Sequence, residues 1–426
     1  MRILQVASGD FFSTYGGGQV YVKNIVDEMI RQGVDVCVVS FVSHHAELKC
    51  LSYQGQPLYE IGTGCEQQIA DVVMKLRPDL IHAHSHKSEI CLLGEKNKLP
   101  VIVTAHHGGI VCPAGTLLDN DDTICQKQVC VTNCLRCCLR NIRTGVYWYP
   151  LVKHLPEGVY SKFGSYLRHK PFIPFITPIG STALAIEGKM EQWRTVSEKC
   201  TLMIAPSNEM GKAMTSRGLD ERKLKVVPHG IPRPKMEPHT TPTADGKIRF
   251  FYIGRICYVK GIHVLLEGFS RVKNKRVELH LIGGAANKAE VRYMHRLQKK
   301  YENDSRVIWH GKIKPVEVYE QIKSYHVSSS SSFLESFGLN ISESLAMGKP
   351  VIATRCGGAE MQIKDGINGW LVPTNNPDAL REKIEEIASH SEILSGMADA
   401  CRESVVYLEE HCQKMIEVYK STLEII

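Results

Sequence analysis

The sequence lacks an uninterrupted hydrophobic run long enough to cross a bilayer. The longest candidate, residues 171–186, is uncharged for 16 residues but contains three prolines, whereas a spanning helix needs about 20 apolar residues. A secretory leader is not expected either, because the opening MRILQVASGD contains one arginine and no cleavage site. We therefore expect a protein of the cytoplasm.

A strong charge imbalance is also missing. The 426 residues carry a formal net charge of +7, with 43% apolar and 23% charged residues, as in ordinary globular chains. This modest charge favours an anionic partner, such as a nucleotide or a membrane surface, without requiring one. The length exceeds what one core usually holds and predicts two domains of about 200 residues each.

Short apolar strands alternate with helical patterns from the first residues onward, including RILQVA, VCVVSF, DLIHAH and VIVTAH. This alternation predicts an α/β fold with parallel, doubly wound sheets. Ligands of such sheets bind beyond the carboxyl ends of the strands, where His84 and His106, or its neighbour His107, would lie. For His84, a structural role at a strand end stays open beside a ligand role.

Five prolines between residues 228 and 242 predict a linker between two domains. The organisation we expect is an N-terminal domain at 1–228, a linker at 229–246, a C-terminal domain at 247–405 and a final helix at 406–426.

Residues 331–358, SSFLESFGLNISESLAMGKPVIATRCGG, carry two carboxylates on either side of a turn. Asn340 followed by Glu343 resembles a capping box, which predicts a helix that starts near Asn340. The amides of its first turn would offer a phosphate site, and Gly338 would let a ligand approach the backbone. Glu335 before the turn and Glu343 on the helix could then hold hydroxyls of the same ligand. This layout suits a sugar nucleotide.

Two cations follow the strand IRFFYIG in the string from Gly254 to Gly261. Arg255 offers a fork of donors and Lys260 a point charge, a combination that can grip a diphosphate. Surface salt bridges are the alternative. A glycine run at residues 16–18, before the first helix, could also place amides beside an anionic ligand, although a plain tight turn is the other reading.

These residues resemble the signature of the retaining glycosyltransferases of family GT4. Shared features are the Glu-x7-Glu pair, the G-K-P-V-I-A-T segment that ends in Gly-Gly, and the G-R-x4-K-G string. The resemblance implies the GT-B architecture, in which two Rossmann-like domains with doubly wound parallel sheets face each other across a cleft. It also implies a metal-independent sugar transfer from a nucleotide-sugar donor to a glycan or lipid-linked glycan acceptor, in polysaccharide or glycoconjugate biosynthesis.

The resemblance also assigns roles, with the acceptor on the N-terminal domain and the donor on the C-terminal one. Glu335 would contact the donor sugar and Glu343 the ribose. Arg255 and Lys260 would carry the charge that develops on the leaving diphosphate. His106 would lie near the reacting sugar. The residues expected at the donor site are Gly17, Gly18, Gly254, Arg255, Lys260, Gly283, Phe337, Gly338, Leu339 and Glu343.

A cysteine-rich insert spans residues 111–139. In a reducing compartment its cysteines should be thiols or metal ligands, and they suffice for a structural zinc site or an iron–sulfur cluster. The spacing matches neither a standard zinc finger nor a ferredoxin, so free or redox-active thiols are the alternative. Because the insert has few apolar residues, a metal would supply most of its order. The six cysteines are Cys112, Cys125, Cys130, Cys134, Cys137 and Cys138.

Residues 139–176 combine six basic residues and eight aromatic ones with a single acid. Such a segment suits the headgroup region of an anionic membrane. Nucleic acid would suit the same chemistry, although we expect no nucleic-acid partner, and a lid that packs on its own domain is a further alternative. The protein could thus associate peripherally with the cytoplasmic face of a membrane.

Two other functional classes stay open. The GT-B fold also hosts nucleotide-sugar epimerases, which lack the full glutamate pair with the R-x4-K string. The cysteine insert leaves room for a non-catalytic metal or redox sensor built on the same fold. Transfer of a sugar to an acceptor would exclude both.

Overall fold

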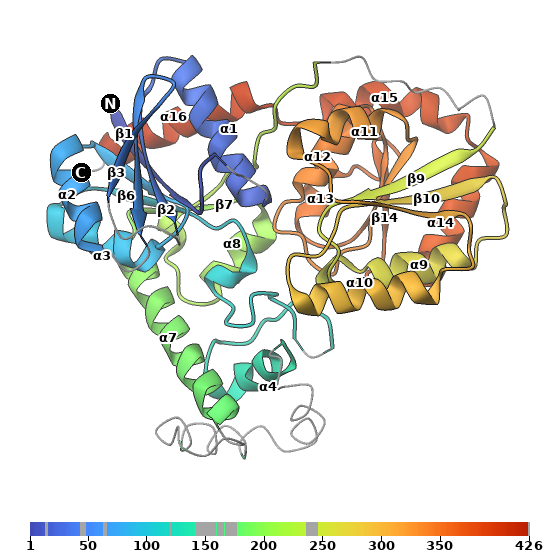
Figure 1. The fold of residues 1–426 in the computed structure, drawn as a ribbon, viewed down its shortest axis with the longest axis horizontal. Coiled ribbons are helices and arrows are strands. Elements are labelled where there is room, and N and C mark those ends of the chain that lie inside the picture. The colour runs from blue at the N-terminus through green and yellow to red at the C-terminus, as the bar shows by residue number, and fades with distance from the viewer. Residues whose placement is uncertain are drawn as a thin grey trace. The chain divides into compact units, whose positions relative to one another are not determined.

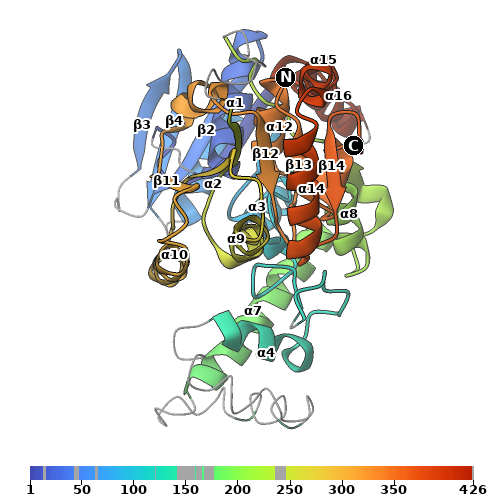
Figure 2. The ribbon, with the colours of Figure 1, turned by 90° about the vertical axis from the view of Figure 1, so that its right-hand side faces the viewer.

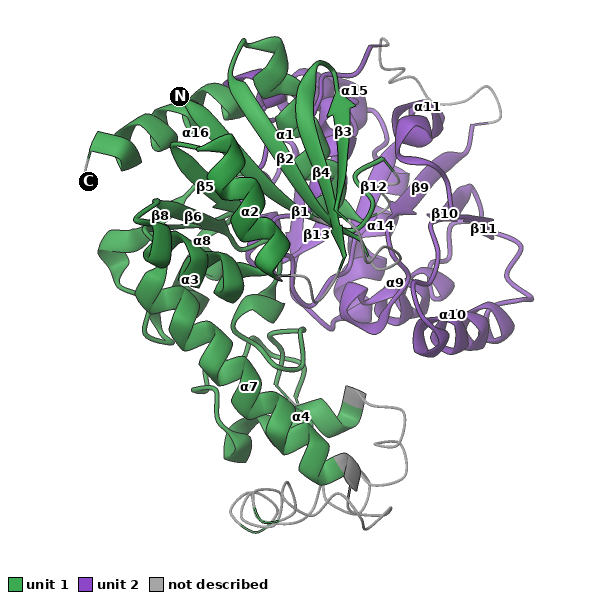
Figure 3. Ribbon diagram, turned by 60° about the vertical axis from the view of Figure 1, so that its left-hand side comes forward, with its two compact units in different colours: residues 1–228, 411–426 green, residues 229–410 purple. Residues whose placement is uncertain are grey.

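The structure is a computed structural model of the whole chain. The chain forms two compact units, one made of residues 1–228 with 411–426 and the other of residues 229–410 (Figure 1, Figure 3). The predicted linker, 229–246, lies mostly outside the part that the structure describes. The described residues are 1–12, 16–42, 48–62, 66–119, 121–141, 177–235 and 246–424, together with Val159 and Tyr166.

Unit 1 is built on an eight-stranded sheet. Its strands are β1 (Arg2–Ser8), β2 (Asp35–Val42), β3 (Lys49–Tyr53), β4 (Gln56–Gly62), β5 (Leu80–Ala83), β6 (Val101–Thr104), β7 (Leu202–Ala205) and β8 (Leu224–Val226). They lie in the order β3-β4-β2-β1-β5-β6-β7-β8, and every neighbouring pair is parallel except β3 with β4. The predicted parallel sheet is confirmed, with one antiparallel edge strand added.

The edge hairpin arises from a local turn that the strand pattern did not reveal. Gln54 and Gly55 join β3 to β4, and both have positive φ, at 50° and 81°. Two consecutive left-handed residues match the twist of a tight hairpin and leave no length for a crossover helix. The Gln-Gly pair was the available signal.

The helices of unit 1 cover the sheet and carry the insert. They are α1 (Gly17–Arg31), α2 (Glu66–Leu76), α3 (Lys87–Asn97), α4 (Val131–Asn141), α7 (Thr177–Lys199), α8 (Asn208–Thr215) and α16 (Leu408–Glu424), which joins this unit from His411 onward, with 3₁₀ turns at Gly108–Ile110 and Glu221–Lys223. Among the described residues, every helix is too short or too polar to cross a membrane.

Helix α4 of the cysteine insert belongs to a hydrophobic cluster that it shares with α7. The two helices pack against each other (Figure 1). The apolar spacing of α4 places one buried stripe against α7, and this stripe includes a cysteine as a small apolar side chain. Packing between two helices therefore orders this part of the insert. The cluster contains Val131, Leu135, Cys138, Leu139, Ile179, Ala183 and Ile186.

Unit 2 is a second doubly wound domain with a fully parallel sheet. Its strands are β9 (Ile248–Ile253), β10 (Val277–Ile282), β11 (Val307–Gly311), β12 (Val327–Ser330), β13 (Val351–Thr354) and β14 (Gly369–Val372), in the order β11-β10-β9-β12-β13-β14. Its helices are α9 (Ile262–Ser270), α10 (Lys288–Lys300), α11 (Val318–Lys323), α12 (Leu339–Ala346), α13 (Gly358–Gln362), α14 (Pro377–Ser389) and α15 (Ile393–Glu403), with 3₁₀ turns at Tyr258–Lys260 and Pro315–Glu317.

Helices cover both faces of this second sheet, with α9 and α14 packed against each other on one of them (Figure 2). The strands β9, β10 and β12 are buried over most of their length between these layers, which agrees with their mainly apolar or small residues. Because all strands run the same way, their carboxyl ends meet at one edge. That edge carries the segments that follow β9, β10 and β12, as expected for ligand sites in such sheets.

Candidate active site

The turn after β12 holds the first predicted carboxylate, Glu335, which bridges to Gly357. Helix α12 starts at Leu339, and Gly338 is its N-cap with a left-handed φ of 92°. The helix starts within one residue of the predicted position, but its N-cap lies two residues before Asn340, so the predicted capping box is wrong. A left-handed N-cap favours a residue without Cβ, which accounts for the glycine.

Lys260 and Glu335 form a close ion pair. The Nζ of Lys260 lies 2.6 and 2.7 Å from the two carboxylate oxygens, and Ser332 Oγ donates to Oε1 at 2.6 Å. The side chain of Glu335 is 5% exposed and that of Lys260 is 25% exposed. Burial acts to lower the pKa of Lys260, but the adjacent Glu335 carboxylate outweighs it and raises that pKa above its usual value. The ammonium therefore stays charged at neutral pH.

The backbone around Lys260 is fixed to the end of β12. A Cβ at Gly261 would lie 1.9 Å from the carbonyl oxygen of Ser331, so only glycine fits this contact. Ser331 Oγ donates to the carbonyl oxygens of Lys260 and Gly261, each at 3.0 Å. Lys260 is thus held by rigid elements before any ligand arrives.

Arg255 pairs with a carboxylate that sequence analysis missed. Its Nε lies 3.1 and 3.0 Å from the two carboxylate oxygens of Glu290, and its Nη2 contacts the same group. Glu290 also accepts hydrogen bonds at 2.8 Å from the amide of Ala286 and from Asn287 Nδ2. Asn287 is the N-cap of α10, so the Asn-x-x-Glu spacing was a visible capping signal, but its link to Arg255 was not.

Gly254 and Gly283 meet at the ends of β9 and β10. A Cβ at Gly283 would lie 1.8 Å from the carbonyl oxygen of Gly254. Their φ angles, 145° and 140°, also fall where side chains are rare. This backbone contact is enough to require glycine at Gly283, whatever binds there.

Glu343 lies on α12 in a site that disfavours its charge. Burial raises the pKa of its carboxyl group to about 7. Within the described part of the chain its carboxylate has no hydrogen-bond donor. A ligand hydroxyl that donates to this carboxylate would compensate its burial, as expected for a group that contacts ribose.

A buried amide that the sequence analysis did not single out holds the loop before α12. Gln362 Nε2 donates to the carbonyl oxygens of Phe337, Gly338 and Gly358, at 2.6, 3.3 and 3.2 Å. Its Oε1 accepts a hydrogen bond from Ser342 Oγ at 2.6 Å. These hydrogen bonds fix the backbone of the turn that contains Phe337 and Gly338. No local pattern marks Gln362. Apart from Gly358, its side-chain hydrogen-bond partners lie about 20 or more positions away in the sequence.

In unit 1 the glycine run and the predicted histidine are neighbours. Helix α1 starts at Gly17, and a Cβ at Gly18 would lie 3.5 Å from the ring of His106. Both lie at the edge where β1 and β6 end, which is the placement expected for His106. The contact of this loop with the donor stays a prediction.

His106 belongs to a chain of hydrogen-bonded rings. Its Nε2 lies 2.9 Å from Nδ1 of His84, and Nε2 of His84 lies 2.8 Å from Oε1 of Gln5. An amide oxygen only accepts, so neutral His84 must carry its proton on Nε2 and accept at Nδ1. It follows that His106 donates from Nε2 and keeps a lone pair on Nδ1. The environment of His84 thus sets the tautomer of His106.

The other end of this chain reaches the last helix. Gln5 Nε2 donates to the hydroxyl of Tyr419 at 3.1 Å, and that hydroxyl lies 2.8 Å from Nδ1 of His82. His82 Nε2 in turn lies 2.7 Å from Thr104 Oγ1. Burial lowers the pKa of His82 to about 3, so this ring is neutral. His84 is therefore one member of a structural network and also lines a cavity.

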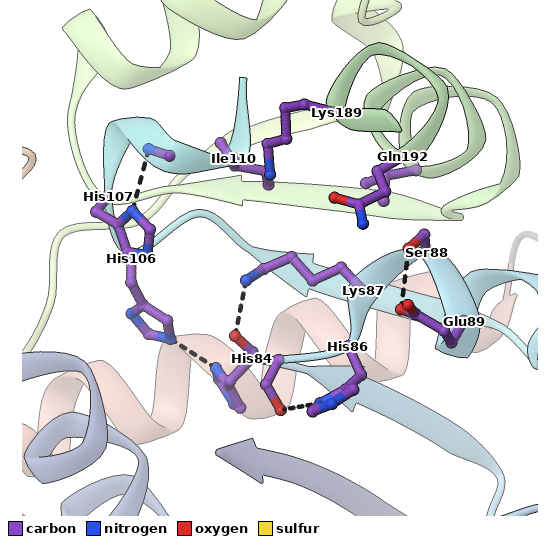
Figure 4. Close-up of a pocket in the computed structure, with 13 residues that line it drawn as sticks. His84, His86, Lys87, Ser88, Glu89, His106, His107, Ile110, Lys189 and Gln192 are labelled. Atoms are coloured by element: carbon purple, nitrogen blue, oxygen red, sulfur yellow. Dashed lines mark hydrogen bonds between the residues drawn. The ribbon is translucent and has the colours of Figure 1, made fainter. Parts of the chain in front are cut away.

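A cavity of about 360 Å³ opens beside His106 (Figure 4). It lies at the carboxyl ends of β5 and β6, between the start of α3 and the side of α7. Its walls carry two lysines that the sequence analysis did not single out, Lys87 on α3 and Lys189 on α7. The further residues that line it are His84, Ser85, His86, Ser88, Glu89, His106, His107, Gly109, Ile110, Gln192 and Val196.

Two family models match this chain. The model described as glycosyl transferases group 1 matches residues 237–404, and the model described as glycosyltransferase family 4 matches residues 15–119. Together they cover more than half of the chain and contain every residue of the predicted donor site. The chain belongs to the family 4, group 1 glycosyltransferases.

Curated relatives of this glycosyltransferase match parts of it. Sucrose synthase from Melioribacter roseus is 27% identical over 178 residues, which are 38% of this chain and 22% of the relative. D-inositol 3-phosphate glycosyltransferase from Geodermatophilus obscurus is 24% identical over 246 residues, or 52% of this chain and 54% of the relative. The chain thus spans between a fifth and about half of the length of these relatives.

Solved structures share the fold of the glycosyltransferase over its full length. The structure of Anabaena HepE in complex with UDP and glucose superposes with a TM-score of 0.68, covering 98% of this chain and 99% of that one at 15% identity. At such low identity this likeness shows the fold alone. The two parallel-sheet domains and this likeness confirm the predicted GT-B fold.

The cysteine insert of this glycosyltransferase lies largely between the regions that the two family models match. None of its six cysteines forms a disulfide bond with another described residue, and burial raises the pKa of Cys134 to about 12 and that of Cys137 to about 11. Among the described residues, no three His, Cys, Asp or Glu side chains converge in a way that suits a metal ion. A structural zinc or iron–sulfur site at these cysteines stays a prediction.

Proposed function

We propose that the protein transfers a sugar from a nucleotide-sugar donor to a hydroxyl of a glycan or lipid-linked glycan acceptor, with retention of the anomeric configuration. The buried pair of Lys260 and Glu335 carries this proposal. It places a charged ammonium and a carboxylate side by side at the ligand edge of a parallel sheet. Such a pair offers a cation to a phosphate and an acceptor to sugar hydroxyls within one site.

Two observations support a nucleotide-sugar donor. HepE, which shares the fold, is described in complex with UDP and glucose. In this chain, Arg255 and Lys260 follow β9 on one short segment, and both are already oriented by carboxylates. Since the side chain of Arg255 is 56% exposed, its guanidinium can face a diphosphate without leaving Glu290.

In the proposed reaction, the bond between the anomeric carbon and the diphosphate oxygen breaks while the acceptor oxygen bonds to the same face of the sugar. Negative charge grows on the leaving diphosphate, where Lys260 and Arg255 stabilise it. A donor phosphate oxygen takes the proton of the acceptor hydroxyl. Glu335 accepts from sugar hydroxyls, Glu343 from the ribose, and His106 lies on the acceptor side. This scheme assigns the charge of the leaving group to side chains, so the donor site needs no metal.

We extend the proposal to a peripheral position on the cytoplasmic face of a membrane, where a lipid-linked acceptor would be met. The support is the composition of residues 139–176, with six basic and eight aromatic side chains. Apart from its first three residues and Val159 and Tyr166, this segment lies outside the described residues.

A screen of nucleotide sugars tests the proposal. Thermal shift identifies the bound donor, and release of free nucleotide in the presence of candidate acceptors measures turnover. Lys260→Gln should lose turnover, whereas Lys299→Gln, an exposed lysine of α10, should keep it. Isomerised donor without acceptor would indicate an epimerase. Binding without any turnover would indicate a sensor, and either result would refute the proposal.

A further inference from the structure

The cavity beside His106 is lined by cations that have no carboxylate partner. Lys87 Nζ donates to the carbonyl oxygen of His84 at 2.7 Å, and Figure 4 shows it pointing into the cavity. Neither Lys87 nor Lys189 has a carboxylate within salt-bridge distance in the described part of the chain. The single acid on the wall, Glu89, accepts a hydrogen bond from Ser88 Oγ at 2.9 Å.

The two lysines also disfavour each other. Burial, followed by the charge of Lys189, lowers the pKa of Lys87 to about 8. Burial likewise lowers the pKa of Lys189, and the nearby Cys112 and Glu89 oppose this only in part. An enclosed cation without a counter-charge costs stability. A bound anion between the two ammonium groups would remove that cost.

The backbone at the mouth of the cavity also favours an anion. Helix α3 starts there, and the side chain of its N-cap, His86, makes no capping hydrogen bond. The positive end of the helix therefore faces the same space as the lysines. His86 itself holds a left-handed conformation, φ 46° and ψ 42°, while its ring stacks on Phe41 with centroids 3.7 Å apart. Such strain in a residue that is not glycine is often stored at ligand sites.

We propose that this cavity binds a phosphate group of the acceptor, held between Lys87 and Lys189 at the start of α3. The binding of phosphate rests on the residues of the cavity alone. Only its assignment to an acceptor rests on the proposed glycosyl transfer, because His106 and His84 line the same cavity.

The size of the cavity limits which ligands can bind. At about 360 Å³ it lies near the small end of ligand pockets and holds a group no larger than one phosphorylated unit. The acceptor is therefore a phosphorylated small molecule, or the phosphorylated end of a longer one. Phosphate is favoured over carboxylate because two ammonium groups, the side-chain amide of Gln192 and the first turn of α3 line the space, which is more than one planar carboxylate uses.

Protection of lysines from acylation tests this inference on the intact wild-type protein. The rates of acylation of Lys87, Lys189 and Lys96 are followed by mass spectrometry at mildly alkaline pH and constant ionic strength. Lys96 is the matched control, since it is exposed on the last turn of the same helix. Saturating inorganic phosphate should slow the acylation of Lys87 and Lys189 about tenfold, because an ammonium group bound to phosphate does not react. The acylation rate of Lys96 should not change.

Further arms separate the outcomes. Acetate and glucose at the same concentration should protect neither lysine, and Lys189→Gln should weaken the protection of Lys87 by phosphate. Equal protection by acetate, equal slowing of Lys96, or no protection at all would each overturn the inference. Donor turnover by the wild-type protein is measured in parallel. Turnover without phosphate protection refutes only this site, and protection without turnover refutes only the proposed transfer.

Discussion

The imidazole of His84 accepts a hydrogen bond at Nδ1 from Nε2 of His106, 2.9 Å away. Because His106 donates from Nε2, its Nδ1 carries a lone pair and can only accept a hydrogen bond. Gln5 enforces this arrangement by accepting the proton on the other nitrogen of His84. A residue of β1 therefore controls what His106 can offer to a ligand without touching the ligand itself.

Replacing Gln5 should disturb the tautomer of His106. In Gln5→Leu the acceptor for His84 is lost, so His106 should become a mixture of tautomers and transfer should fall about 10- to 100-fold. Imidazole ¹⁵N shifts report the tautomer directly. Met29→Leu is the control, because Met29 Sδ accepts from Gln5 Nε2 at 3.5 Å and not from the side of Gln5 that holds His84, and leucine roughly conserves the side-chain volume. Unchanged ¹⁵N shifts in Gln5→Leu would contradict this role.

Glu343 should make stability depend on pH. Its pKa is raised from about 4.5 to about 7, so the folded protein binds more protons than the unfolded chain in this interval. Stability should therefore fall as pH rises from about 4.5 to about 7, by up to about 1.4 kcal/mol per pH unit. Denaturant midpoints of the wild type and of Glu343→Gln across this range check it. Parallel curves for the two proteins would rule out the raised pKa.

The insert should depend on its apolar core. Leu135→Ala removes a fully buried side chain from the cluster between α4 and α7 and should cost about 2–5 kcal/mol of local or global stability. Leu92→Ala, at a half-exposed site on α3, is the control. Hydrogen exchange of α4 and metal analysis of the purified protein are measured together. A stoichiometric metal in the purified protein, together with loss of protection in α4 when a chelator is added, would contradict this prediction. That result would support a metal as the source of order in the insert.

Residues 139–176 should attach the protein to anionic vesicles. Binding should weaken as salt rises, because charges are screened beyond about 10 Å at 0.1 M ionic strength. Lys153→Gln with Lys162→Gln should reduce the bound fraction, and Lys299→Gln with Lys300→Gln should not. Equal sedimentation with neutral and anionic vesicles would remove the membrane role.

Local patterns in the sequence predicted much of the fold and part of the site. Strands, glycine turns and the carboxylate Glu335 are written in consecutive residues, so periodicity and the resemblance located them. The residues that orient them are not. Gln5 and Tyr419 are 414 positions apart, and Lys260 is 75 positions from Glu335. Such pairs form only when the sheet brings distant strand ends together, and no short spacing records them.

The pair of Lys260 and Glu335 offers the most direct test of the account. Lys260→Met alone should destabilise unit 2 by about 3 kcal/mol, because it leaves a buried carboxylate unpaired, and adding Glu335→Leu should recover most of that loss. Sugar transfer from the identified donor should fall about 100-fold or more in both variants, since the cation at the leaving group is gone. Recovery of transfer together with stability in the double variant would show that the pair is only structural and would contradict the account.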